Sequence, residues 1–100
     1  MTEVQEVFNL YVEHLNGLDE RHNFGVDTGR KYWKVWMSFD QYRPNPQRSV
    51  HAFVDRQTGD VHKPGSWKAP QPNGIRYNLL KDLPTIYSKA DVYGSYLYKF

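Results

Sequence analysis

The first 18 residues carry the pattern that most restricts the fold of this chain, because apolar side chains recur there at spacings of three and four. That spacing places them on one face of an α-helix. They are Val4, Val7, Phe8, Tyr11, Val12, Leu15 and Leu18. Thr2 and Gln5 are spaced as in a capping box, and Asn16-Gly17 provides a helix end. Since the polar face is acidic, we expect the helix to cover a sheet and not a membrane surface.

Two later segments alternate apolar and polar side chains, as β-strands do. In residues 31–39, KYWKVWMSF, one face is wholly apolar and the other is aromatic and basic. The apolar face holds Trp33, Val35, Met37 and Phe39, and the mixed face holds Tyr32, Lys34, Trp36 and Ser38. Residues 48–55, RSVHAFVD, place Val50, Ala52 and Val54 on one face and His51, Phe53 and Asp55 on the other. The pattern predicts two antiparallel strands joined by a proline-containing turn at 40–47.

Turn residues dominate the rest of the chain. Gly59 suits a hairpin turn that leads into a short third strand at 61–63. Residues 18–30 are interpreted as a connection, and residues 64–78 as a long Pro- and Gly-rich loop without regular structure. Residues 79–88 indicate a short C-terminal helix with Pro84 in its first turn, and the tyrosine-rich tail suits either a last strand or a segment that faces a partner.

These patterns predict an α+β fold in a single domain, residues 1–100. An N-terminal amphipathic helix packs on a small antiparallel sheet of three or four strands, with the long Pro/Gly-rich loop and a short C-terminal helix. A chain of 100 residues with 39% hydrophobic content has material for one core. It contains no cysteine, which favours a cytosolic location. Neither a signal peptide nor a membrane-spanning run is apparent, so we expect no membrane association.

Charge is distributed unevenly along the chain. Residues 1–29 contain one basic and six acidic side chains, whereas residues 30–81 contain ten basic and three acidic ones. The middle of the chain is therefore a candidate surface for an anionic partner. Alternatively, an acidic helix packs beside a basic sheet and the charges largely neutralise one another.

No motif for catalysis or metal binding stands out. The four histidines, His14, His22, His51 and His62, do not fall at the spacings of common metal sites. His51 and His62 could approach across the hairpin, but without a firm carboxylate ligand. Ser66 lacks the glycines of a nucleophile elbow, and residues 25–31, GVDTGRK, lack the spacing of a phosphate-binding loop. We therefore expect no catalytic residues, no metal, no cofactor and no enzymatic activity.

An aromatic and basic constellation remains, in which Tyr32 and Phe53 accompany six candidate binding residues. The six candidates for ligand or partner binding are Lys34, Trp36, Trp67, Lys68, Arg76 and Tyr77. Aromatic rings for base stacking, combined with Lys and Arg charges, are what single-stranded nucleic-acid binders use. The structural alternative is that these aromatics fill the core and that Trp67 pins down its own loop.

Residues 50–80, VHAFVDRQTGDVHKPGSWKAPQPNGIRYNLL, together with KYWKVW at 31–36, resemble a group of small accessory proteins of tailed bacteriophages. The matching positions are Phe53, Val54, Asp55, Thr58, Gly59, Lys63, Pro64, Ser66, Trp67, Lys68, Ala69, Pro70, Arg76 and Tyr77. The match covers about half of the chain and departs from the group at 71–74, where a basic residue is expected. The resemblance implies an accessory role in the cytoplasm of an infected bacterial host.

The leading functional hypothesis is a non-enzymatic phage protein that binds and modulates a host or bacterial-defence protein, because exposed tyrosines and arginines dominate binding hot spots. The alternative is a binder of a nucleotide or of single-stranded nucleic acid, including a sponge for a signalling nucleotide, that uses the aromatic and basic face. A third reading, an enzyme that acts on phosphorylated small molecules, requires a histidine or carboxylate that converges with Arg76. The sequence predicts no oligomeric state.

Overall fold

The structure, a computed structural model, describes residues 2–39 and 48–98, so the turn expected at 40–47 lies outside the described residues. The elements, in order, are α1 (Glu3–Asn16), β1 (His22–Thr28), β2 (Tyr32–Phe39), β3 (Arg48–Asp55), β4 (Asp60–Pro64), β5 (Pro70–Asn78), α2 (Leu79–Lys89) and the 3-10 helix η1 (Ser95–Leu97). The fold is α+β, as predicted. Its strands form one antiparallel sheet in the order β1-β2-β3-β4-β5. Within the described residues, no helix is long and apolar enough to cross a membrane.

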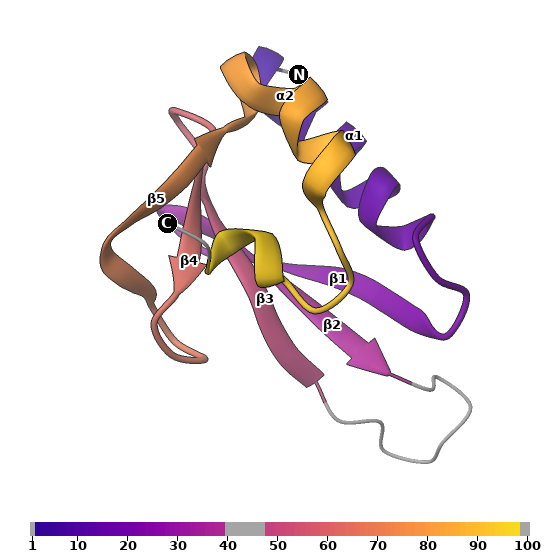
Figure 1. Cartoon of the computed structure of the whole chain (residues 1–100). Helices are drawn as coiled ribbons and strands as arrows, with labels where there is room; N and C mark the ends of the chain where they lie inside the picture. The colour runs from indigo at the N-terminus through magenta and orange to yellow at the C-terminus, as the bar shows by residue number, and fades with distance from the viewer. Residues whose placement is uncertain (1, 40–47, 99–100) are drawn as a thin grey trace.

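Helix α1 covers one face of the sheet, as its apolar stripe predicts. Helices α1 and α2 lie side by side, and the C-terminal turn η1 lies on the same side of the sheet (Figure 1). Phe8 of α1 stacks on Trp33 of β2, with ring centroids 4.0 Å apart. Thr2 Oγ1 accepts a hydrogen bond from the Gln5 backbone, but the Gln5 side chain donates to Asn9 instead of completing a capping box. The helix ends at Asn16, as expected.

The prediction of three or four strands is wrong, since the sheet has five. One missed strand, β1, lies within residues 18–30, which were interpreted as a connection. It pairs with β2 along its whole length, and Gly25 lies opposite Trp36. A Cβ atom on Gly25 would lie 2.0 Å from the Trp36 ring, so glycine here makes room for a neighbouring side chain and does not mark a turn.

The second missed strand, β5, overturns the prediction that residues 64–78 have no regular structure. Pro70 and Pro72 lie at the start of a strand at the sheet edge, where a proline need not donate to a further strand. The pairing of β4 with β5 is irregular after Val61. The expected long loop therefore shrinks to residues 65–69.

Two details of β2 and β3 also differ from strict alternation. Phe39, expected in the core, is 48% exposed at the end of β2. The register shifts in β3, where Ala52 pairs with Val35 and Val50 with Trp36, so His51 is the extra residue of a β-bulge. A bulge re-aims side chains, and His51 is buried on the helix side instead of facing the other side with Phe53.

The His51 ring completes a buried chain of hydrogen bonds. Its Nε2 atom lies 2.8 Å from the Tyr96 hydroxyl, which lies 2.6 Å from the Tyr11 hydroxyl. Burial raises the pKa of both tyrosines, so both hydroxyls are protonated at neutral pH. The chain joins α1, the bulge of β3 and the C-terminal turn, three parts that lie far apart in the sequence.

The C-terminal region differs from its prediction in two respects. As far as residue 98, where the described part ends, the tail forms no strand, and Tyr96 and Leu97 are buried in η1 and not exposed. The C-terminal helix was predicted with Pro84 in its first turn, but α2 begins at Leu79 and Pro84 lies one turn further on.

Asn78 connects three elements at the start of α2. Its Oδ1 atom caps the helix by accepting hydrogen bonds from Leu80 and Lys81. Its Nδ2 atom donates to the Thr58 carbonyl and to Asp60 Oδ1, across the turn that contains Gly59. Gly59 has a φ of 80°, as the hairpin prediction requires. One amide side chain thus holds the β3–β4 turn, the end of β5 and α2 together.

We predict that Asn78→Ala lowers the free energy of unfolding by about 2 kcal/mol, because the cap and the two bonds across the turn are lost together. Urea denaturation measures this difference. Asn78→Ser retains a capping oxygen and should recover part of the loss. Equal losses in the two variants would show that the cap contributes nothing.

A second prediction concerns pH. Burial lowers the pKa of His51 from 6.5 to about 4, against the opposing effects of Asp91 and of a hydrogen bond with the Val92 backbone. The unfolded chain therefore binds a proton more readily than the folded one between these values. The neutral, buried His51 therefore makes its full contribution to the free energy of unfolding above pH 6.5. This contribution is lost as the pH falls to about 4, which lowers the free energy of unfolding by up to roughly 3 kcal/mol.

Urea denaturation of the wild type and of His51→Gln between these pH limits tests whether His51 causes the loss of stability in acid. The wild type should lose more stability on acidification than the variant, since only the wild type carries the buried imidazole. Parallel pH profiles would contradict it.

Candidate functional site

The face of the sheet opposite the helices, here called the outer face, carries the alternate side chains of the central strands. In β2, Trp33 and Val35 point into the core, so Lys34 and Trp36 point outward. Lys34 lies opposite Asp27 of β1 and Phe53 of β3. This face therefore presents cations and rings at neighbouring positions.

Trp67 reaches this face from the loop between β4 and β5. The Lys34 ammonium lies 4.2 Å from the centre of the Trp67 ring, a cation–π contact. The loop is folded tightly, because the backbone amides of Gly65 and Ser66 both donate to the Ala69 carbonyl. Trp67 is still 40% exposed, so it has surface left for another contact.

A hollow of about 260 Å³ lies beside this contact and is called the basic pocket. Its charged lining consists of four cations and one carboxylate: Arg30, Lys31, Lys34, Lys68 and Asp27. The rings of Tyr32 and Phe53 also line it, with their centroids 6.1 Å apart at a steep angle; Tyr32 is partly exposed, whereas Phe53 is buried beneath its neighbours. None of the four cations forms an ion pair within residues 2–39 and 48–98. Positive charge therefore converges here without internal compensation by contact.

His62 of β4 borders this aromatic surface without adding charge. Its ring lies edge-on to Tyr32, with centroids 5.4 Å apart. Partial burial lowers the pKa of His62, although Asp60 and Asp55 oppose the shift, so the imidazole is neutral at neutral pH. The attraction of the pocket for an anion thus comes from lysine and arginine and does not change near neutral pH.

Trp36 forms a second pair of ring and cation on the outer face. The Arg48 guanidinium carbon lies 4.2 Å from the centre of the Trp36 ring. The ring covers Gly25, and its Nε1 atom is buried without a hydrogen-bond partner in the described part of the chain. Trp36 lies two residues beyond Lys34 on the same strand, so both pairs belong to one face.

The structure brings together only part of the predicted site. Lys34, Trp67 and Lys68 meet at the basic pocket, and Trp36 lies on the same face. Tyr77 lies in the core with 7% exposure, 6.0 Å from the Tyr96 ring. Arg76 donates from Nε to the Leu97 carbonyl and holds the C-terminal turn.

Two cations of the pocket, Arg30 and Lys31, are absent from the predicted site. They occupy the turn between β1 and β2. The sequence analysis includes both in the basic middle of the chain but does not name either as a candidate binding residue. Recognition of β1 as a strand would have paired Asp27 with Lys34 and placed this turn beside the outer face.

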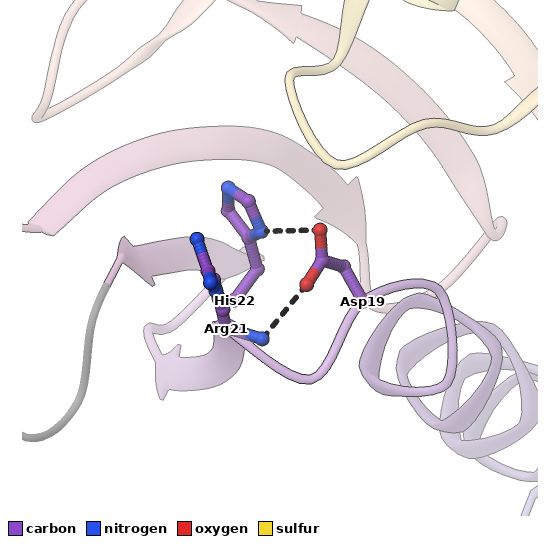
Figure 2. A network of polar contacts seen from close by, with 3 residues as sticks. All are labelled: Asp19, Arg21 and His22. Carbon is purple, nitrogen blue, oxygen red and sulfur yellow. Dashed lines mark hydrogen bonds and ion pairs between the residues drawn. The ribbon is translucent and has the colours of Figure 1, made fainter.

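A separate polar cluster lies where α1 leads into β1, and Figure 2 shows its three residues. Asp19 Oδ1 accepts a hydrogen bond from the Arg21 backbone at 2.8 Å, and this bond is the main cause of the lowered pKa of Asp19. Asp19 Oδ2 lies 3.3 Å from His22 Nδ1, a contact without hydrogen-bond geometry. The cluster shapes a turn, and no group of three or more metal-ligating side chains occurs among the residues described.

The fold and the pocket define a small α+β protein with a cationic, ring-lined hollow on the outer face of its sheet. Family of unknown function (DUF7717) matches residues 2–99, so the chain belongs to this family. No curated protein and no solved structure matches the chain.

We predict that Gly25→Ala displaces the Trp36 ring, because the new Cβ would lie 2.0 Å from it. Loss of its packing should cost about 1–3 kcal/mol, and the near-ultraviolet circular dichroism should change. Gly17→Ala is the matched control, since its Cβ would meet nothing closer than 3.5 Å. Wild-type stability in Gly25→Ala would contradict the packing described.

Proposed function

We propose that this protein is a non-enzymatic binding protein whose outer face holds a nucleotide or single-stranded nucleic acid. The observation that carries the proposal is the convergence of four cations, none of them ion-paired in the described residues, around aromatic rings in the basic pocket. Phosphate groups match the charge, and bases match the rings. This ligand is the alternative hypothesis of the sequence analysis, and the geometry favours it over a protein partner.

The Trp67 ring provides the stacking surface in this proposal. Lys34 approaches one side of the ring, and the ring is 40% exposed. A base that stacks on the exposed part would place its phosphate near Lys68, the adjacent residue and a member of the pocket lining. Stacking of one base contributes roughly 1–3 kcal/mol, so a few such contacts suffice for useful affinity.

The enzyme hypothesis lacks comparable support. It requires a histidine or carboxylate that converges with Arg76 on a phosphorylated substrate. Arg76 instead bonds to the Leu97 and Asn73 carbonyls, beside the C-terminal turn. We therefore propose binding without catalysis. The proposed setting, an accessory role for a phage in the bacterial cytoplasm, depends on the resemblance of residues 50–80 alone.

A protein partner, such as a host or defence protein, is the second candidate, and one observation favours it. Tyr93 is 73% exposed and Phe39 is 48% exposed, and both rings contact His22. Exposed aromatic clusters are common at binding hot spots. Affinity capture from bacterial lysate with and without nuclease, followed by mass spectrometry, distinguishes the candidates. A protein partner is retained after nuclease treatment, a nucleic-acid complex is lost, and a bound nucleotide is detected directly.

We predict that replacing Lys34 and Lys68 together by Gln weakens the binding of a labelled single-stranded oligonucleotide about ten- to hundredfold. The salt dependence of binding should become shallower, with the slope of log K against log salt falling by roughly one to two. Fluorescence anisotropy at about 50 and about 200 mM salt measures both effects.

Trp67→Ala should weaken binding about fivefold or more without a large fall in melting temperature.

The matched control is the double substitution of Lys81 and Lys89 by Gln, which removes the same charge from helix α2. It should change binding little. We call the double substitution Lys34→Gln and Lys68→Gln the pocket variant. If the control weakens binding as much as the pocket variant, the loss of affinity is due to net charge and not to the pocket. If neither the oligonucleotide nor labelled ATP binds the wild type, the proposed function is wrong.

A further inference from the structure

A second hollow adjoins the basic pocket and shares one of its cations. It encloses about 720 Å³, and its lining includes Arg30, Arg56, Trp33, Gln5 and Gln57. Arg30 belongs to the lining of both hollows. We call this second hollow the edge hollow, because it lies between the start of α1 and the β1–β2 and β3–β4 turns. Its described lining contains no carboxylate.

Arg56 is held in a defined position at the edge hollow. Its Nη1 atom donates to the Gly29 carbonyl at 2.6 Å, and its guanidinium carbon lies 5.6 Å from the centre of the Trp33 ring. A guanidinium has five N–H donors, and the structure uses one of them in this bond. A pre-positioned guanidinium with donors to spare suits a phosphate group.

The sizes of the two hollows bear on the length of the ligand. Pockets that enclose a whole small-molecule ligand measure roughly 300–1,000 Å³. The basic pocket, at about 260 Å³, falls just short of that range, whereas the edge hollow, at about 720 Å³, lies within it. The basic pocket alone therefore suits part of a ligand, such as one base with its phosphate, and the shared Arg30 marks the direction in which the ligand continues.

We propose that the ligand is a single-stranded nucleic acid of several nucleotides and not a mononucleotide. The strand lies in the basic pocket, crosses the β1–β2 turn at Arg30 and places its next phosphates against Arg56 in the edge hollow. This inference rests on the proposed function, since it extends the same site. It adds a minimum ligand length and a second set of contacts that the outer face alone does not require.

The experiment measures affinity against length. Deoxythymidine oligomers of roughly two, four, eight and twelve nucleotides are titrated against the full chain by fluorescence anisotropy at constant salt. We expect affinity to rise at least tenfold between the dimer and the octamer and then to level off, once both hollows are filled. Equal affinity for the dimer and the octamer, per binding site, would overturn the inference and leave the proposed function intact.

Gln57→Glu tests the edge hollow directly. Gln57 is exposed and, of these two hollows, lines the edge hollow and not the basic pocket, so the substitution adds a negative charge there without removing any side-chain contact that the structure shows. It should weaken octamer binding about tenfold and leave dimer binding unchanged. Lys81→Gln on α2 changes the net charge equally and is the control. An unchanged octamer affinity in Gln57→Glu would contradict the path through the edge hollow.

Arg56→Gln provides a second variant with the same expected split between octamer and dimer. Since Arg56 also donates a hydrogen bond to the Gly29 carbonyl, the melting temperature of this variant is measured alongside its affinity. The pocket variant, Lys34→Gln with Lys68→Gln, should weaken the binding of both the dimer and the octamer. If labelled ATP binds the wild type but no oligomer of any length does, the inference is wrong and the proposed function stands. If neither ATP nor any oligomer binds, the proposed function fails together with the inference.

Discussion

The hydroxyl of Tyr96 is the contact on which the rest of the structure depends. It bonds to Tyr11 of α1 and to His51 at the bulge of β3, and all three side chains are buried. Each polar group thus has a partner. An orphaned buried group costs about 1–3 kcal/mol, so the chain fixes α1, the sheet and the C-terminal turn in one arrangement.

The helices and the C-terminal turn thus cover one face of the sheet. Strand geometry then determines which side chains lie on the other, outer face. Successive side chains of β2 alternate, so burial of Trp33 and Val35 against α1 forces Lys34 and Trp36 to the opposite side. The bulge is confined to β3 and diverts His51 into the core, while Phe53, two residues on, still pairs with Lys34. Packing on one side of the sheet therefore sets the composition of the candidate site on the other.

The sequence predicts those parts of the fold whose cause is local. Apolar periodicity predicts helix α1 and strand β2, and a glycine suited to a positive φ predicts the turn at Gly59. The structure contains all three. Strands β1 and β5 were missed because the meaning of their glycine and prolines depends on a neighbour. Gly25 makes room for Trp36, and Pro70 lies at an edge, neither of which the sequence reveals. The same limit applies to the site. Lys34, Trp67 and Lys68 were named in advance, whereas Arg30 and Lys31 could be placed only once β1 was known.

The arrangement also decides between neutralised and separated charge. The glutamates of α1, Glu3, Glu6 and Glu13, are exposed, and the apolar face of the helix packs on Trp33, on the face of the sheet opposite Lys34. Packed layers lie about 10 Å apart, and physiological salt screens exposed charges beyond about 8 Å. The carboxylates of α1 therefore cannot neutralise the pocket by contact, and solvent screens their influence from afar. If the protein binds a nucleic acid as proposed, the uncompensated charge of the four cations would also draw the polyanion toward the basic pocket during approach.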